Sequence, residues 1–228
     1  MKMLVTDYDN TFHIKDCDMI ENVKKAKEFM NNNIFVIATG RSYNSYNTQK
    51  ALFDIETNYL IINHGATILK DDNIIYNKSI DNDVKNEMLK YLNLDFAKVV
   101  FCYSAKDEVS IDTDNLTKII LEYYDKQETF KVAELIKEKF NNKVNVFLFP
   151  LHNSLEIISS AVDKSNAIDI ISKLENIDEI YTIGDNHNDF LMIKKYHGYC
   201  TEVAVKEVKD IAIKQYKNVS DLICEIME

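Results

Sequence analysis

Short apolar runs rich in β-branched residues alternate with helical periodicity at both ends of this chain, and this alternation constrains the fold most strongly. The runs lie at Met3–Thr6, Ile34–Ala38, Tyr59–Ile62 and Glu179–Ile183, and apolar residues recur at helical spacing from Ile20 to Met30. Continuous apolar strands joined by crossover helices are typical of parallel sheets that are covered on both faces. We therefore predict an α/β fold with a doubly wound, mostly parallel, Rossmann-like sheet.

Smaller features complete this core. Ala66–Leu69 and Ile74–Tyr76 flank a run of aspartate and asparagine and predict a hairpin. The helix that starts near Ile20 is expected to be capped by Asp16 or Asp18. A polar stretch through Lys50 connects the second and third strands, and no element is assigned to it.

The middle of the chain has a different pattern, which predicts an inserted α+β domain at residues 81–159 between two core segments, 1–80 and 160–228. Each half of the insert is expected to contain one helix followed by two strands. In chain order these elements are a helix at Val84–Leu92, strands at Val99–Tyr103 and Glu108–Ile111, a helix at Phe130–Phe140, and strands at Val144–Phe149 and Leu155–Ile158.

Charge and hydropathy exclude several classes of function. The 228 residues carry a formal net charge of -10, which argues against a nucleic-acid partner bound through backbone phosphates. No apolar run approaches the ~20 residues of a membrane-spanning helix, and the apolar start is interrupted too early for a secretory signal. The sequence thus predicts a cytoplasmic protein with neither a nucleic-acid nor a membrane partner; its oligomeric state is left open.

Polar residues follow the predicted core strands at the edge where open α/β sheets bind ligands. Asp7 and Asp9 follow the first strand, and Thr39-Gly40-Arg41 follows the second and could bind an anion. Asp185 and Asp189 follow the strand at Glu179–Ile183 and could also simply cap the next helix. Four carboxylates at one sheet edge favour a divalent cation, and oxygen ligands point to Mg²⁺.

These residues resemble the four motifs of the haloacid dehalogenase superfamily of phosphohydrolases, in order along the whole chain. The segment Asp7-Tyr8-Asp9-Asn10-Thr11 resembles the first motif and Thr39-Gly40-Arg41 the second. Lys164, which opens an amphipathic helix, resembles the third, and Gly184-Asp185-Asn186-His187-Asn188-Asp189 matches the fourth. The position of the insert resembles the cap of the Cof-type and sucrose-phosphatase-like branch, as does the turn Asn63-His64-Gly65-Ala66.

The chain departs from the family pattern at three positions. Asn10 stands where the first motif usually has glycine, and asparagine is among the residues best able to adopt a left-handed backbone. His64 stands where the branch has asparagine, and its role is left open. Ser165 follows Lys164 where many relatives have glycine.

The resemblance implies an Mg²⁺-dependent phosphatase that hydrolyses small phosphomonoesters, such as sugar phosphates, through an aspartyl-phosphate intermediate. Asp7 would be the nucleophile and Asp9 the general acid and base, which needs a pKa raised toward neutrality. The metal site would comprise Asp7, the backbone carbonyl of Asp9, Asp185 and Asp189. The residues implied in phosphate or substrate binding are Asn10, Thr39, Gly40, Arg41, Lys164 and Asn188. The inserted domain would act as a lid.

Two alternatives stay open. A phosphomutase of the same fold would use Asp7 and Asp9 but return the phosphoryl group to its substrate. A receiver-type phospho-acceptor module also combines clustered aspartates, a threonine and a lysine on a doubly wound sheet. The order of the motifs and the ~75-residue insertion oppose this second alternative.

Overall fold

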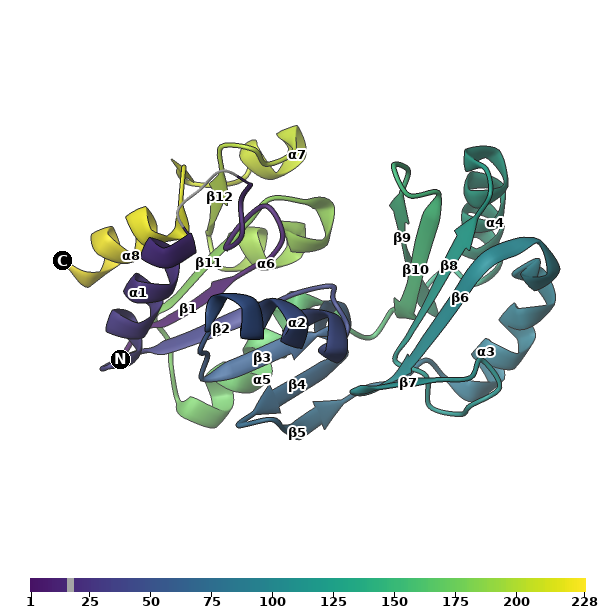
Figure 1. Cartoon of the computed structure of the whole chain (residues 1–228), viewed down its shortest axis with the longest axis horizontal. Helices are drawn as coiled ribbons and strands as arrows, with labels where there is room; N and C mark the ends of the chain where they lie inside the picture. Colours follow the sequence, from purple (N-terminus) through teal and green to yellow (C-terminus); the bar gives the residue numbers. More distant parts are fainter. Residues whose placement is uncertain (16–18) are drawn as a thin grey trace. The chain divides into compact units, whose positions relative to one another are not determined.

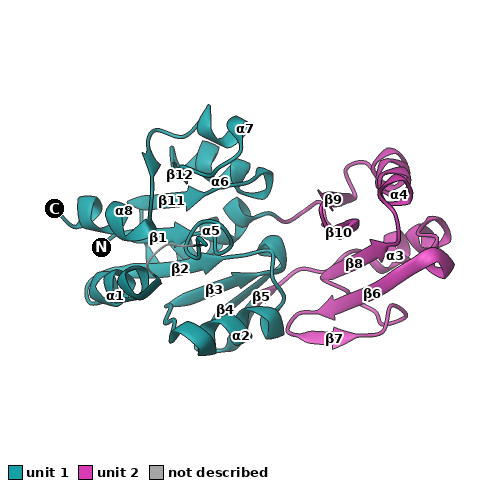
Figure 2. Ribbon diagram, turned by 45° about the horizontal axis from the view of Figure 1, so that its top comes forward, with its two compact units in different colours: residues 1–75, 163–228 teal, residues 76–162 magenta. Residues whose placement is uncertain are grey.

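The computed structural model describes residues 1–15 and 19–228 and divides into two compact units. Unit 1 comprises residues 1–75 and 163–228, and unit 2 comprises residues 76–162 (Figure 2). The sequence analysis placed these divisions at 80/81 and 159/160. The expected helix cap at Asp16 or Asp18 lies outside the described residues. Within the described part of the chain, no helix is both long and apolar enough to cross a lipid bilayer.

Unit 1 contains an eight-stranded sheet with the strand order β13-β12-β11-β1-β2-β3-β4-β5, whose edge strand β5 continues past the boundary at residue 75 (Figure 1). The strands from β13 to β3 run parallel, and β4 is antiparallel to β3. The strands are β1 (Met3–Thr6), β2 (Ile34–Ala38), β3 (Tyr59–Ile62), β4 (Thr67–Lys70), β5 (Asn73–Asn77), β11 (Ile180–Gly184), β12 (Tyr199–Thr201) and β13 (Gln215–Tyr216). The helices are α1 (Met19–Met30), α2 (Tyr43–Phe53), α5 (Lys164–Glu175), α6 (Phe190–Lys195), α7 (Lys206–Lys209) and α8 (Val219–Met227).

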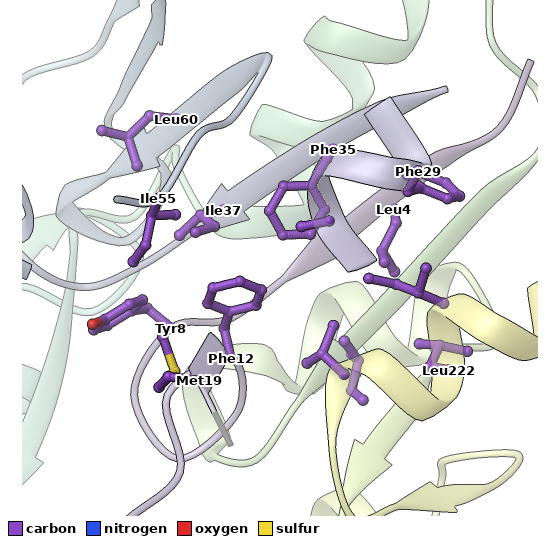
Figure 3. Close-up of a cluster of buried hydrophobic side chains, with 14 of the residues drawn as sticks. Leu4, Tyr8, Phe12, Met19, Phe29, Phe35, Ile37, Ile55, Leu60 and Leu222 are labelled. Carbon is purple, nitrogen blue, oxygen red and sulfur yellow. The ribbon is translucent and has the colours of Figure 1, made fainter. Parts of the chain in front are cut away.

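The central strands of this sheet are buried on both faces, which confirms the doubly wound α/β fold. Every residue of β1, β2 and β3 is buried. On one face, side chains from α1, α2 and α8 pack against the sheet, and Figure 3 shows Phe12, Phe29, Phe35 and Leu222 within this cluster. Full burial of both faces explains why these strands are continuous apolar runs in the sequence.

Unit 2 contains a five-stranded sheet in the order β7-β6-β8-β10-β9, and all its pairs are antiparallel. Its elements are α3 (Asn82–Met88), β6 (Ala97–Ser104), β7 (Asp107–Val109), β8 (Lys118–Tyr123), α4 (Lys126–Lys139), β9 (Val144–Phe149) and β10 (Ser154–Ser159). Apolar residues from one face of this sheet pack with residues of α3 and α4 to form a separate core.

Two elements correct the sequence analysis. β8, the central strand of unit 2, was not predicted, because three consecutive apolar residues, Ile119–Leu121, obscure its alternation. Helix α2 occupies the polar stretch through Lys50, for which the sequence pattern predicts no element. Tyr46 is its one buried residue, so the helix has almost no apolar stripe from which to recognise it.

Buried and half-buried side chains alternate along β8 from Ile119 onward, which allows a test with a matched control in the same strand. Ile119 is fully buried in the core of unit 2, whereas Ile120 on the opposite face is only half-buried. We expect Ile119→Ala to lower the free energy of unfolding by about 2–4 kcal/mol through cavity formation, and Ile120→Ala to cost clearly less. Urea unfolding followed by circular dichroism measures both. Equal losses would contradict the assigned facing of this strand.

Candidate active site

The candidate site lies at the carboxyl edge of the unit 1 sheet, where three neighbouring parallel strands end together. Thr6, the last residue of β1, pairs with Ile37 on one side and with Ile183 on the other. The residues that follow these strands are therefore close in space. Asp7 follows β1, Thr39 follows β2 and Asp185 follows β11.

A tight turn after β1 fixes the first carboxylate. The amide of Asp7 donates to the Ile183 carbonyl at 2.9 Å, and its own carbonyl accepts from the amide of Phe12 at 3.1 Å. Asn10 has φ 57°, so the left-handed conformation expected of this asparagine is confirmed. The side chain of Asp7 is thereby held on a backbone that both β11 and its own turn restrain.

Lys164 joins two of the predicted acidic residues. Its Nζ lies 2.5 Å from Asp7 Oδ1 and 2.6 Å from Asp189 Oδ1, and all three side chains are buried. Lys164 is the first residue of α5, whose N-cap is Asp163. The Asp163 carboxylate accepts from the amide of Asn166 at 2.9 Å, which fixes the start of the helix and with it the position of Lys164.

Asp189 both caps a helical turn and holds Lys164. Its second oxygen, Oδ2, accepts from the backbone amides of Asp185 at 3.0 Å and Asn186 at 3.1 Å, within a capping box. The capping interpretation is thus correct for Asp189, where it coexists with the ion pair. Asp185 is buried beside it, and Thr11 Oγ1 donates to Asp185 Oδ1 at 3.3 Å.

The cluster has more negative charge than its own lysine balances. Ligand atoms of Asp7, Asp185 and Asp189 all lie within 4.8 Å of one another, and Lys164 is the cation bonded to this group among the described residues. Burial, reinforced by the Asp189 carboxylate, raises the pKa of Asp185 to about 7. Burial likewise raises the pKa of Asp7, although Lys164 opposes the shift. Burial lowers the pKa of Lys164, but Asp189 and Asp7 outweigh it and the net shift is upward.

This charge imbalance is the test of whether a divalent metal ion fits. Three buried carboxylates with one lysine leave two negative charges to be offset, and carboxylate oxygens are ligands that Mg²⁺ accepts. Asp189 uses both oxygens for protein contacts, whereas Asp7 uses one of its oxygens for Lys164. The residues present therefore fit a cation held chiefly by Asp7 and Asp185.

The turn after β2 lies beside this cluster. Thr39 Oγ1 accepts from the amide of Arg41 at 3.1 Å. The Arg41 guanidinium binds both carboxylate oxygens of Asp9, with Nε to Oδ2 at 2.8 Å and Nη2 to Oδ1 at 2.7 Å. In this structure Arg41 is paired with Asp9, and its expected role in substrate binding stays a prediction.

His64 connects the second motif with the fourth. Its amide donates to the Thr39 carbonyl at 3.1 Å, and its Nδ1 lies 3.4 Å from Asn188 Nδ2. The ring packs directly on Gly40, where an added Cβ would lie 2.3 Å from His64 Cε1. From the sequence alone, the role of His64 is open and Thr11 has no predicted role. Their positions within motif-like segments were the available signal.

The comparisons with known proteins agree with this geometry. A family model described as haloacid dehalogenase-like hydrolase matches residues 4–114 and 99–221, so the chain belongs to this family. An uncharacterised protein of Mycoplasma capricolum is 28% identical over 233 aligned residues, which cover 86% of this chain and 88% of the relative. A protein of Buchnera aphidicola, provisionally named a phosphatase, is 26% identical over 221 aligned residues, which cover 84% of this chain and 82% of the relative.

Solved structures share the fold across the whole chain. A HAD/COF-like hydrolase from Plasmodium vivax superposes with a TM-score of 0.85 at 19% identity, covering 100% of this chain and 95% of that one. A HAD subclass IIB sugar phosphatase superposes with a TM-score of 0.77 at 15% identity, covering 100% of this chain and 99% of that one. These similarities confirm the α/β fold, and the family model confirms the family resemblance.

The raised pKa of Asp185 predicts how metal-free stability depends on pH. The pKa of Asp185 in the folded state, about 7, lies above the ordinary value of 3.8. Ionising this group therefore lowers the stability of the folded state. Its contribution to stability is fully present below about pH 4 and is lost as the pH rises to about 7. We expect Asp185→Asn to raise the melting temperature in EDTA at pH 8 and to have less effect at pH 5.

A matched control uses an aspartate whose pKa is shifted the other way. Asp169 lies outside the site and bonds Lys195 and Tyr196; although partial burial opposes the shift, these bonds lower its pKa. Asp169→Asn should therefore destabilise at pH 8. Added Mg²⁺ should stabilise the wild type more at pH 8 than at pH 5. Destabilisation by Asp185→Asn in EDTA at pH 8 would contradict the charge imbalance.

The contact between Gly40 and His64 predicts that mutations at these two positions have non-additive effects on stability. Gly40→Ala places a methyl group against the buried His64 ring and should cost about 1–3 kcal/mol of stability. His64→Ala removes the ring, so the same change at Gly40 should cost much less in that background. Urea unfolding of the two single variants and the double variant measures the coupling. Additive effects would show that the His64 ring is not the source of the cost of Gly40→Ala.

Proposed function

We propose that this protein is an Mg²⁺-dependent phosphatase that hydrolyses small phosphomonoesters, such as a sugar phosphate, through an aspartyl-phosphate intermediate. The observation that carries the proposal is the buried Asp7 carboxylate, bonded to Lys164 and surrounded by the excess negative charge of Asp185 and Asp189. A carboxylate nucleophile, a fixed cation and an acidic cluster suited to a metal are the groups that phosphoryl transfer requires. Membership of the hydrolase family supports the proposal.

In the first step, a carboxylate oxygen of Asp7 forms a bond to phosphorus as the bond from phosphorus to the leaving oxygen breaks. Asp9 gives its proton to that oxygen. In the second step, Asp9 takes a proton from water, whose oxygen attacks phosphorus and displaces Asp7 as a carboxylate. Inorganic phosphate leaves, and both aspartates return to their initial states.

Several groups would bind the phosphate oxygens. Lys164 has the charge to do so, while Thr39, the amide of Gly40 and Asn188 could donate hydrogen bonds. Asn10 contributes through the turn that it closes. Asp7, Asp185 and the Asp9 carbonyl would hold Mg²⁺, with Asp189 supporting them. When bound, the ion screens the carboxylate nucleophile from the negative phosphate.

Unit 2 is proposed to act as the cap that selects among small phosphorylated metabolites, the partners that we expect for this protein. One of the solved structures that shares this fold is described as a sugar phosphatase. That description, together with the inserted position of residues 76–162 between the second and third motifs, supports this assignment.

Hydrolysis of p-nitrophenyl phosphate tests the proposal. We expect turnover by the wild type in Mg²⁺, loss of turnover in EDTA, and a fall of at least about 1,000-fold for Asp7→Asn. Asp169→Asn removes a carboxylate outside the site and should keep near-normal activity. Failure to hydrolyse any phosphomonoester, with stable labelling of Asp7 by an acyl phosphate, would overturn the phosphatase proposal.

A further inference from the structure

Arg41 is the single arginine of this chain. The 27 basic residues comprise 26 lysines and this one arginine. All the other basic residues are lysines, including the buried Lys164 in the site itself. A guanidinium differs from an ammonium in its planar fork, which can bind both oxygens of a carboxylate at once. Arg41 can therefore make contacts with a carboxylate that a lysine at the same position could not make.

All three guanidinium nitrogens of Arg41 have protein partners. Nε and Nη2 bind the two oxygens of Asp9 at 2.8 Å and 2.7 Å, and Nη1 donates to Ser45 Oγ at 3.0 Å. The guanidinium carbon also lies 5.4 Å from the centre of the buried Tyr8 ring. A lysine could supply the charge here, but not the paired bonds that fix the orientation of a carboxylate.

The Arg41 backbone is fixed as well. Its amide donates to Thr39 Oγ1 at 3.1 Å, and its carbonyl accepts from the amide of Asn63 at 3.0 Å. The two residues beside it in the second motif, Thr39 and Gly40, are proposed phosphate ligands. Arg41 thus connects the phosphate-binding turn to the side chain of Asp9.

The two bonds from Arg41 do not occupy every acceptor site of the Asp9 carboxylate. A carboxylate has about four lone-pair sites, and two parallel arginine bonds use one on each oxygen. The Asp9 side chain is 46% exposed, so its remaining sites are accessible. We infer that Arg41 is a positioning residue, which holds the Asp9 carboxylate in the orientation for proton transfer to the leaving group and does not itself bind the phosphate. This inference rests on the proposed function.

The single arginine allows a test that needs no activity. In a ¹⁵N-labelled sample, the arginine Nε–H region of the NMR spectrum contains one signal, that of Arg41. We expect this signal to be protected from exchange in the wild type, to move and lose protection in Asp9→Asn, and to stay in place when inorganic phosphate and Mg²⁺ are added. A phosphate-induced change like that of Asp9→Asn would overturn the inference, because it would place Arg41 on the phosphate.

Kinetics then test the positioning role. Phenyl phosphate has a more basic leaving group than p-nitrophenyl phosphate and depends more on protonation, while the phosphate that binds is the same. We expect Arg41→Ala and Arg41→Lys to lower kcat/KM by about 10- to 100-fold for phenyl phosphate and by less than about 3-fold for p-nitrophenyl phosphate. Free guanidinium should restore part of the loss in Arg41→Ala. An equal loss on both substrates, or no loss on either, would overturn the positioning role.

Lys70 provides a matched control. Its Nζ lies 2.8 Å from Glu175 Oε1 and 4.9 Å from the centre of the Tyr59 ring, so it too is a partly exposed cation paired with a carboxylate over a tyrosine. Lys70→Ala should leave the ratio of kcat/KM for the two substrates unchanged. If the wild type hydrolyses neither substrate, the proposed function fails and the positioning role with it. If the wild type hydrolyses both substrates and the Arg41 variants are as active as the wild type, the positioning role alone is overturned.

Discussion

The buried ion pairs of Lys164 with Asp7 and Asp189 are the interactions on which the site depends. An isolated lysine at this depth would be costly, and so would either aspartate alone. Each charge is therefore tolerated because the others are present. The pairs also bind together segments that are far apart in the chain, since Asp7 follows β1, Lys164 opens α5 and Asp189 follows β11.

Much of unit 1 could be predicted because its strands are buried on both faces. β1, β2 and β3 have the predicted bounds, and β11 lies within one residue of its predicted position. The carboxyl ends of parallel strands meet at one edge, so the sequence alone places Asp7, Asp185 and Asp189 together. Lys164 could be placed only by its resemblance to a motif, since nothing in its local sequence signals burial.

Two of the features that were missed depend on contacts that no local pattern encodes. The partner of Arg41 is one of them: a guanidinium after a strand suits an external anion and Asp9 equally well, and the folded geometry selects Asp9. Helix α2 is another, because a crossover between β2 and β3 fixes it with one buried side chain. β8 did carry alternation, but its apolar run concealed the pattern.

The close approach of Gly65 to Asp163 restrains the chain where it returns to unit 1 after residue 162. Gly65 has φ 107°, and an added Cβ would lie 2.3 Å from the Asp163 carbonyl, at the residue where the chain re-enters unit 1. Asp163 also caps α5 and precedes Lys164. The re-entry point is therefore clamped on both sides, by a turn of unit 1 and by the helix that follows. The start of α5, and with it Lys164, is therefore restrained by contacts that lie within unit 1 itself.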